Sequence, residues 1–397
     1  MSYINFKEEK AKASNQIKKR KINNENLYNT IIKNKKTLSK YYPSIEYSYK
    51  KIIENFIGKK GILGEEDFYE INNKDIICTK FISCRFENIR FKECKFIGCT
   101  FEECDFSGGG VVFERCIFIK EDSDKLPSLN RKDNLGCSFY KCKLYIKVLN
   151  SDMAYCIFED SKIYDSSFEQ SNMKNTFILN SEINKTEVVD CDFCGLKIIK
   201  TYIVDFFFED KYLTKFDENT FFDKIIPRVK DKQEYEGIYM TYQIYADKFK
   251  DNNLNNNFGE YYYCAKSIER KCIDSLTAKI NSYILWLTCG YGERPSFCLF
   301  SSLFIIVVFG FIYLIIGIDI EGDIIKYSLQ NIMNFNLNTF IKHYNEALNL
   351  SVGMFGAVGI ANSKPTEIGY MISNIEMLLG IIMMGVAIGT LTRKIIR

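Results

Sequence analysis

The sequence predicts a mixed fold of three parts: a four-sided β-coil, a helical hairpin and a pair of membrane-crossing helices. A large apolar residue recurs at every fifth position through much of the first half of the chain. Apolar residues then recur at helical spacing, and two runs near the C-terminus are long and almost free of charge. We expect a basic, partly helical N-terminal segment, a repeat solenoid, a helical connector and a transmembrane region at 1–77, 78–208, 225–290 and 291–397, respectively.

The five-residue repeat predicts the coil. Phe stands at every fifth position from 81 to 106, and a residue that is usually small precedes each of them by two. The register shifts at 108–110, and a charged insertion occupies 119–136. Five residues match neither the helix period nor the strand period, so the backbone must turn a corner in each repeat, and four sides would close a coil of about 20 residues. Large side chains should stack inside, with successive coils ~4.8 Å apart.

After the insertion, the predicted pairs of a small and a large inward residue are Cys137/Phe139, Cys142/Leu144 and Lys147/Leu149. The register is expected to slip by one near Met153 and then to run unbroken from Phe158 to Ile203. Nine of the fifteen cysteines occupy the small position: Cys84, Cys94, Cys99, Cys104, Cys116, Cys137, Cys142, Cys156 and Cys191. Cysteine behaves there as a small hydrophobe, so we expect free thiols.

No catalytic or metal site is predicted. Cys191 and Cys194 form one CxxC pair, but no second pair follows it to complete a four-ligand zinc site. The sequence holds one His and shows no nucleophile paired with a base. We therefore expect a protein that is not an enzyme and needs no cofactor.

The repeat stretch resembles the pentapeptide-repeat family, whose fold is a right-handed quadrilateral β-helix. Some members of that family mimic DNA and bind type II topoisomerases, and those tend to be strongly acidic. Residues 78–203 hold 19 acidic and 18 basic side chains, and the whole chain has a net charge of +3. We therefore expect no nucleic-acid mimicry and no nucleic-acid partner, and the solenoid is expected to be a structural or docking element.

The connector is predicted to be an αα-hairpin. Tyr235, Ile238, Tyr242 and Tyr245 recur at helical spacing, and the polar stretch 251–259 breaks this first helix. A second helix is expected over about 260–280. The tyrosine stripe is interpreted as the core of the hairpin rather than a binding cage. An apolar stretch with Trp286 follows, and Trp commonly lies at the membrane interface.

Two spans are predicted, at 296–318 and 368–391, and the second carries one internal charge, Glu376. Basic residues flank the outer ends of this pair: Lys266, Arg270, Lys271, Lys279 and Arg294 precede the first span, and Arg393, Lys394 and Arg397 follow the second. The positive-inside rule then puts both flanks, and hence the N- and C-termini, in the cytoplasm. The charged N-terminus shows no secretory signal.

The segment 337–365 is predicted to be a pore loop. It contains a short helix at about 338–352 and then a Gly-rich stretch, all between the two spans. Irregular backbone at membrane depth is tolerated only where protein covers it or where it lines an aqueous path.

From the YGERP motif at 291–295 to the C-terminus, the sequence resembles the two-transmembrane, pore-loop ion channels of the potassium-channel superfamily. The resemblance implies a homotetramer in a lipid bilayer, pore support from Glu376 and an inner-helix hinge at Gly380 and Gly385. It places the selectivity filter at Ala357, Val358, Gly359, Ile360, Ala361 and Asn362. Pentapeptide repeats, a hairpin and YGERP before such a pore also look like a known bacterial domain arrangement, which implies a multi-pass protein of the bacterial cell membrane.

The filter departs from the family pattern. Ala361 replaces its second Gly, Asn362 its Asp, and Met354 and Ala357 its two Thr. Ala in the left-handed conformation costs ~1–2 kcal/mol, and a lost hydroxyl removes a ring of ligands. We therefore expect a cation channel that is weakly selective among monovalent cations such as K⁺ and Na⁺.

Two residues leave alternatives open. Glu376 either bonds to the pore-helix backbone behind the filter, which we favour, or faces the pore as a cation site. His343 is expected to be a plain exposed residue near the pore helix, with pH sensing as the alternative.

The main alternative to a channel is a membrane-anchored pentapeptide-repeat scaffold or docking protein whose pore domain does not conduct. A topoisomerase-binding module is disfavoured by the balanced charge. A membrane anchor needs only one span and no Gly-rich re-entrant loop. The second span and the loop therefore distinguish the channel from the scaffold. Both leave room for an unidentified cytoplasmic regulator.

Overall fold

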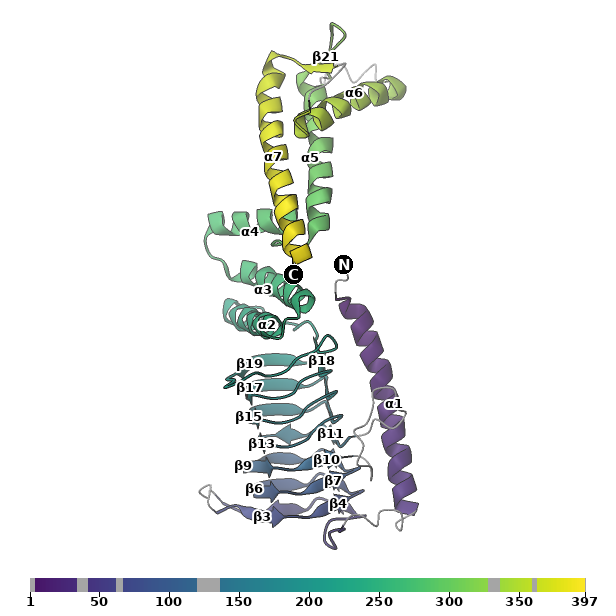
Figure 1. Cartoon of the computed structure of the whole chain (residues 1–397), viewed down its shortest axis with the longest axis vertical. Coiled ribbons are helices and arrows are strands. Elements are labelled where there is room, and N and C mark those ends of the chain that lie inside the picture. The colour runs from purple at the N-terminus through teal and green to yellow at the C-terminus, as the bar shows by residue number, and fades with distance from the viewer. Residues whose placement is uncertain are drawn as a thin grey trace. The chain divides into compact units, whose positions relative to one another are not determined.

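The computed structural model describes residues 4–33, 42–61, 67–119, 136–327, 336–358 and 363–396, and it divides into two units, Met1–Cys272 and Ile273–Arg397. The first unit holds the helix α1 (Phe6–Lys33), a β-solenoid and the hairpin of α2 (Lys232–Asp251) and α3 (Asn255–Cys272) (Figure 1). Within its described residues, the second unit holds four helices and a small sheet. They are α4 (Leu276–Cys289), α5 (Pro295–Ile316), β21 (Ile318–Ile320), β22 (Asp323–Ile325), α6 (Leu337–Phe355), β23 (Ser363–Pro365) and α7 (Glu367–Ile396).

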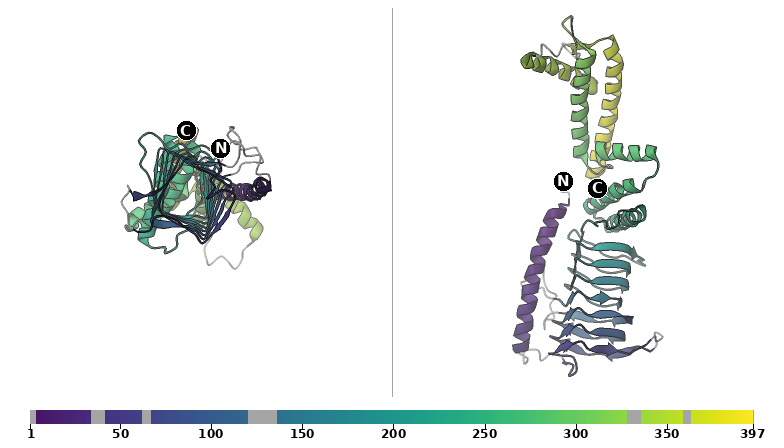
Figure 2. Two further views of the ribbon diagram at one scale, coloured as in Figure 1. Left: turned by 90° about the horizontal axis from the view of Figure 1, so that it is seen from below. Right: turned by 180° about the vertical axis from the view of Figure 1, so that it is seen from behind.

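The solenoid is built from short parallel strands that stack in successive coils. They are β1 (Lys51–Ile53), β2 (Phe56–Gly58), β3 (Tyr69–Asn72), β4 (Asp75–Ile77), β5 (Lys80–Ile82), β6 (Arg85–Lys92), β7 (Lys95–Ile97), β8 (Thr100–Glu102), β9 (Asp105–Glu114), β10 (Ile117–Ile119), β11 (Ser138–Tyr140), β12 (Lys143–Leu144), β13 (Ile146–Leu149), β14 (Ile157–Glu159), β15 (Lys162–Glu169), β16 (Phe177–Leu179), β17 (Glu182–Val189), β18 (Lys197–Ile199), β19 (Tyr202–Phe208) and β20 (Phe221–Phe222). Figure 2 shows the four-sided outline of this stack in the view from below.

The register confirms the predicted coil. Phe81 pairs with Phe101, and Ile163 pairs with Ile183, so a coil without an insertion takes 20 residues. The corner residues adopt left-handed backbone angles at every fifth position, as at Cys78, Ser83, Asn88, Glu93, Gly98 and Glu103. Left-handed angles at such regular spacing turn the chain between sides, and Asn and Asp accept them more readily than most residues do.

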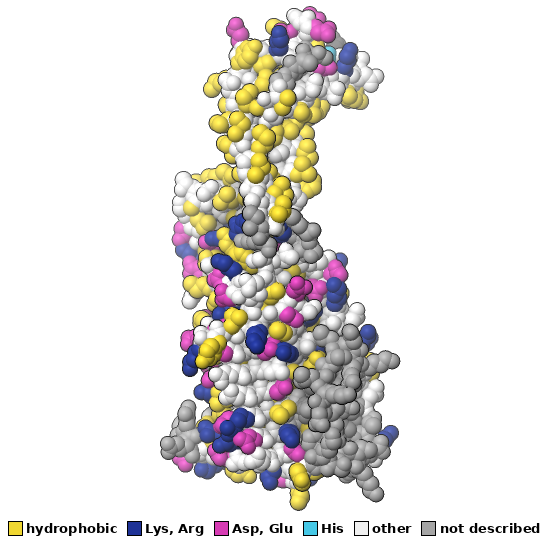
Figure 3. All heavy atoms as spheres, in the orientation of Figure 1, with side chains coloured by type: hydrophobic (Ala, Val, Ile, Leu, Met, Phe, Trp, Pro, Cys, Tyr) yellow, Lys and Arg dark blue, Asp and Glu magenta, His cyan; other side chains and the backbone are white. Residues whose placement is uncertain are grey.

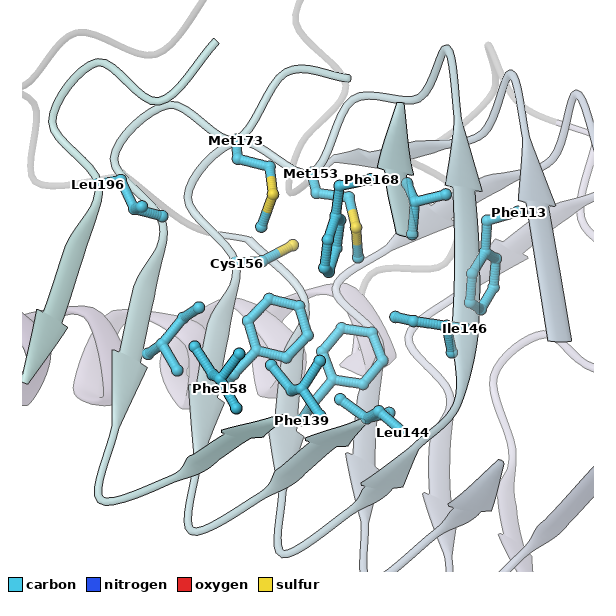
Figure 4. Close-up of a cluster of buried hydrophobic side chains, with 14 of the residues drawn as sticks. Phe113, Phe139, Leu144, Ile146, Met153, Cys156, Phe158, Phe168, Met173 and Leu196 are labelled. Carbon is cyan, nitrogen blue, oxygen red and sulfur yellow. The ribbon is translucent and has the colours of Figure 1, made fainter. Parts of the chain in front are cut away.

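Large side chains stack inside the coil at the predicted spacing. The rings of Phe81, Phe101, Phe139 and Phe158 lie nearly parallel, with successive centroids 4.9, 4.7 and 4.7 Å apart. Figure 4 shows Phe139 and Phe158 side by side in this interior. Four such columns bury the repeat's apolar residues, and this burial supplies the main stabilisation of the solenoid.

The cysteines of the small positions are buried free thiols, as predicted. They also do more than fill space. The thiol of Cys94 donates to the carbonyl of Ile71 and that of Cys99 to the carbonyl of Ile76, each at 3.1 Å, which links one coil to the coil before it. Serines use the same contact later in the array, as Ser151 Oγ does with Phe113 O.

The solenoid boundaries differ from the prediction of 78–208. It begins with β1 and β2, because Ile52 lies under Phe81 and Ile57 under Phe86 in the first coil. It ends at β20, which pairs with β18. The sequence did not predict the first coil, because its inward residues are Ile rather than Phe and residues 59–68 interrupt the five-residue spacing.

The pair Lys147/Leu149 was wrong. Ile146 and Val148 point inward instead, and Val148 pairs with Phe113 on one side and Phe168 on the other. The register therefore slips before Val148 and not near Met153. The physical reason is that a Lys at the small inward position would bury an unpaired ammonium group, whereas Lys147 in the structure is exposed.

The hairpin caps the C-terminal end of the solenoid. Its tyrosines form the hairpin core, as predicted, and they also satisfy the last coil. Tyr261 OH accepts a hydrogen bond from Phe222 N and donates one to Phe222 O, both at 2.8 Å. Tyr242 OH accepts from Ile225 N, and the Tyr245 ring stacks on Phe222 at 4.0 Å. An uncapped edge would leave such backbone groups open to pairing with another chain.

The predicted second helix at 260–280 is two helices. The break falls at Ser275, whose hydroxyl caps α4 by accepting from Ala278 N. The N-terminal segment is helical in α1, which runs beside one side of the solenoid (Figures 1 and 2). Ala13 and Ile17 of α1 are buried against Ile157, Phe177, Leu179, Ile199 and Phe221 of that side.

Candidate functional site

Two helices of the second unit are long and apolar enough to cross a membrane, by length and composition: Pro295–Ile316 and Glu367–Ile395. At 22 and 30 residues, α5 and α7 extend about 33 and 45 Å, against ~30 Å of hydrocarbon. They pack side by side. The helix α6 crosses them near the end that lies opposite α4 (Figure 1). The strands β21, β22 and β23 form an antiparallel sheet that joins the end of α5 to the start of α7.

Glu376 ties these three helices together. Its side chain is fully buried, and its carboxylate contacts the hydroxyl of Tyr313 from α5 at 2.7 Å and that of Ser351 from α6. Ser351 Oγ also lies 2.9 Å from Ile306 O. A buried carboxyl group is tolerated only with such partners. The expected bond to the pore-helix backbone was wrong in detail, because the amides inside α6 are used in the helix itself and the hydroxyls take their place.

At Gly380, α7 lies close to the backbone at the end of α6. A Cβ added there would lie 2.0 Å from the carbonyl oxygen of Phe355, the last residue of α6. A Cβ added at Gly385 would meet no described atom within 4 Å. The two predicted hinge residues thus differ in their surroundings. Packing requires a glycine at 380 but not at 385. Their role as a hinge stays a prediction.

The chain leaves α6 through a Schellman motif. Ala357 N donates to Met354 O and Val358 N donates to Gly353 O, both at 3.1 Å, while Ala357 has a φ of 54°. Val358 follows with 85% of its side chain exposed. Of the predicted filter, Gly359, Ile360, Ala361 and Asn362 lie outside the described residues.

His343 is half-buried rather than exposed, which corrects the prediction. Its Nδ1 lies 2.8 Å from the hydroxyl of Tyr327, and the two rings are also in contact. The histidine is therefore part of the packing between α6 and the segment after β22.

Two contacts of this unit were not predicted from the sequence: Tyr313 with Glu376, and Glu293 with Arg393. Tyr313 carries a usable signal, because its hydroxyl lies in an uncharged span and needs a hydrogen-bond partner. Glu293 of the YGERP motif is buried and pairs with Arg393 at 3.0 Å. No local pattern in the YGERP motif predicts that Glu293 contacts Arg393 near the C-terminus.

Comparison with known proteins supports the repeat domain. The family model of pentapeptide repeats (nine copies) matches residues 81–122. The solenoid is therefore a pentapeptide-repeat domain within a longer chain. No curated protein sequence matches the chain significantly.

Among solved structures, two forms of QnrB1, described as a plasmid-mediated fluoroquinolone resistance protein, are similar to part of the chain. A trypsin-treated variant shows 12% identity and a TM-score of 0.16 over 42% of this chain and 89% of its own. The full-length form shows 12% identity and a TM-score of 0.15 over 42% and 92%. We base the fold of the solenoid on its own register and stacking.

Proposed function

Starting from a pentapeptide-repeat solenoid and two helices long enough to cross a membrane, we propose that this protein is a homotetrameric cation channel. It lies in the bacterial cell membrane with both termini and the solenoid in the cytoplasm. The observation that carries the proposal is the Glu376 cluster, which holds α6 against both apolar helices. A simple membrane anchor has no need of a third helix fixed in this way.

The surface of α5 and α7 supports a membrane and partner subunits around them. Large apolar side chains are exposed along both helices: Leu299, Phe300, Phe304, Ile315, Met371, Leu378, Ile381 and Ile388. Figure 3 shows hydrophobic side chains gathered over these helices, while charged side chains spread over the solenoid. Two helices cannot enclose a water-filled path, so the pore requires several copies of the chain.

The permeation path is proposed to follow the chain beyond α6. A path lined by backbone carbonyl oxygens would favour cations over anions, because these oxygens carry partial negative charge. Only part of the family's ordered filter geometry is available to a sequence with Ala361 and Asn362. The pore is therefore proposed to pass K⁺ and Na⁺ with little preference, and the solenoid to serve assembly or regulation.

A first test measures the assembly. Native mass spectrometry or crosslinking in detergent should give four subunits. A stable monomer or dimer would contradict a pore.

A second test measures conduction. Purified protein in planar bilayers should carry cation current, and the bi-ionic reversal potential should lie near zero for Na⁺ against K⁺. A strong K⁺ preference would contradict the proposed reading of the filter, and an anion current would contradict the pore.

A matched pair of variants tests the Glu376 cluster. In Glu376→Gln, the amide can still accept from Tyr313 and donate to Ser351, so tetramer and current should persist. In Glu376→Ala, Tyr313 loses its carboxylate partner and Ser351 keeps only Ile306 O, so the link from α7 to the other two helices and the current should be lost. If Glu376→Gln instead changes ion selectivity, Glu376 faces the pore as a cation site.

The second candidate is a membrane-anchored scaffold with a non-conducting helical part. The pentapeptide-repeat domain favours it, because solenoids commonly offer extended docking surfaces. Absence of current from a stable tetramer, together with capture of a defined partner by the solenoid, would support this candidate instead.

A further inference from the structure

The turn between α4 and α5, residues 290–295, has an unusually constrained backbone. Gly290, Tyr291 and Gly292 follow one another with φ of 52°, 56° and 79°. Its amides bond within the turn, as Glu293 N does to Gly290 O and Arg294 N to Cys289 O, both at 3.1 Å. Tyr291 OH lies 3.0 Å from Ser282 Oγ of α4. We call residues 290–295 the elbow.

The elbow presents a buried carboxylate to the end of α7. Glu293 is 1% exposed, and its Oε1 lies 3.0 Å from Nη2 of Arg393 in the last turn of α7. Removing one partner of an ion pair that includes a buried charge is strongly destabilising, because the remaining charge lies away from water. The position of the α7 end is therefore coupled to the presence of both charges.

The surroundings of this pair fit a clamp. A Cβ added to Gly292 would lie 3.0 Å from Nη1 of Arg393, so the glycine makes room for the guanidinium group. One turn further into each helix, Cys298 and Thr390 are both buried, and their Sγ and Oγ1 atoms lie 3.9 Å apart. The end of α7 is thus held by the ion pair of Arg393 and, one turn earlier, by the packing of Thr390 against Cys298.

We propose that Glu293 is a positioning residue that clamps the end of α7 through Arg393. Because α4 leads directly into the elbow, a displacement of α4 would move Glu293 and with it the end of α7. The effect on pore opening rests on the proposed channel function, whereas the clamp itself does not. In the tetramer, the four clamped ends of α7 set the equilibrium between the open and the shut pore.

The clamp is tested first without any current, by hydrogen exchange of the full-length protein in detergent. In Glu293→Gln and in Arg393→Gln, the amides of 388–396 should exchange at least about tenfold faster, whereas those of 367–380 should not change. The effect of the double variant should be smaller than the sum of the two single effects, because both single variants remove the same ion pair. Lys279→Gln removes a basic charge of α4 that pairs with no described carboxylate, and it should exchange as the parent does.

Single-channel recording then tests the consequence for gating. Both single variants should change the open probability by at least about tenfold in the same direction, and Lys279→Gln should leave it unchanged. Arg393→Lys keeps the charge without the planar fork and should fall between parent and Arg393→Gln. Unchanged exchange in Glu293→Gln, or additive effects in the double variant, would overturn the clamp. Faster exchange without current in any variant would support the clamp and overturn the channel.

Discussion

Replacement of Gly380 by Ala should force α6 away from α7. The new Cβ would stand 2.0 Å from Phe355 O and 2.8 Å from Phe355 C, where ordinary contacts lie at 3.4–4 Å. These are backbone atoms, so no side-chain rotation relieves the overlap. One of the two helices must shift by more than an ångström, and the end of α6, from which the predicted filter departs, is the part displaced.

The magnitude follows from two opposing terms. Overpacking of a close contact costs ~1–3 kcal/mol, and Ala recovers up to ~1 kcal/mol over Gly in a helix. Because the overlap is with backbone atoms, the cost should lie near the upper end, ~2–3 kcal/mol, which leaves a net loss of about 1–2 kcal/mol and a roughly 5- to 30-fold larger population of the locally open state. Gly385→Ala gains the same helix propensity without a contact, since no described atom lies within 4 Å of its Cβ.

Hydrogen exchange of the intact protein in detergent measures this difference directly. Amides near the end of α6, residues 350–358, should exchange faster in Gly380→Ala by that factor and should not change in Gly385→Ala. Equal protection of 350–358 in Gly380→Ala and the parent would refute the inferred contact. An equal loss of protection in both variants would show that the effect belongs to Gly replacement in general.

Three further predictions concern the first unit. Phe101→Ala should destabilise the solenoid by ~3–5 kcal/mol in chemical unfolding, because Phe101 is buried between Phe81 and Phe139, whereas Phe207→Ala, at 46% exposure, should have little effect. Burial raises the pKa of the Cys191 thiol to about 12, whereas an unfolded thiol has a pKa of ~8.5. The free energy of unfolding should therefore fall as the pH rises above ~8.5, and Cys191→Ser should make this fall less steep. Arg20→Ala should release α1 to proteolysis, because Arg20 donates to Asn175 O at 2.5 Å and lies over the Phe177 ring, and exposed Lys19→Ala serves as the control.

Features that repeat or extend along the chain could be predicted from the residues alone. Phe at every fifth position required a corner in every repeat, and the structure has left-handed residues at that spacing. The small inward position predicted buried thiols, and the uncharged runs predicted two long apolar helices. Such properties can be predicted because each depends on residues that are close together in the sequence.

Contacts between residues that are distant in the sequence depend on how the elements pack, and local patterns did not predict them. The inward role of Val148 emerged from its pairing with Phe113 and Phe168, since local spacing allowed either register there. Tyr261 closes the last coil through Phe222, which lies far from it in sequence. Glu376 finds Tyr313 and Ser351 on two other helices, and Glu293 finds Arg393 a hundred positions later. A buried polar group must have a partner, but its own sequence neighbourhood does not say which residue the fold will bring to it.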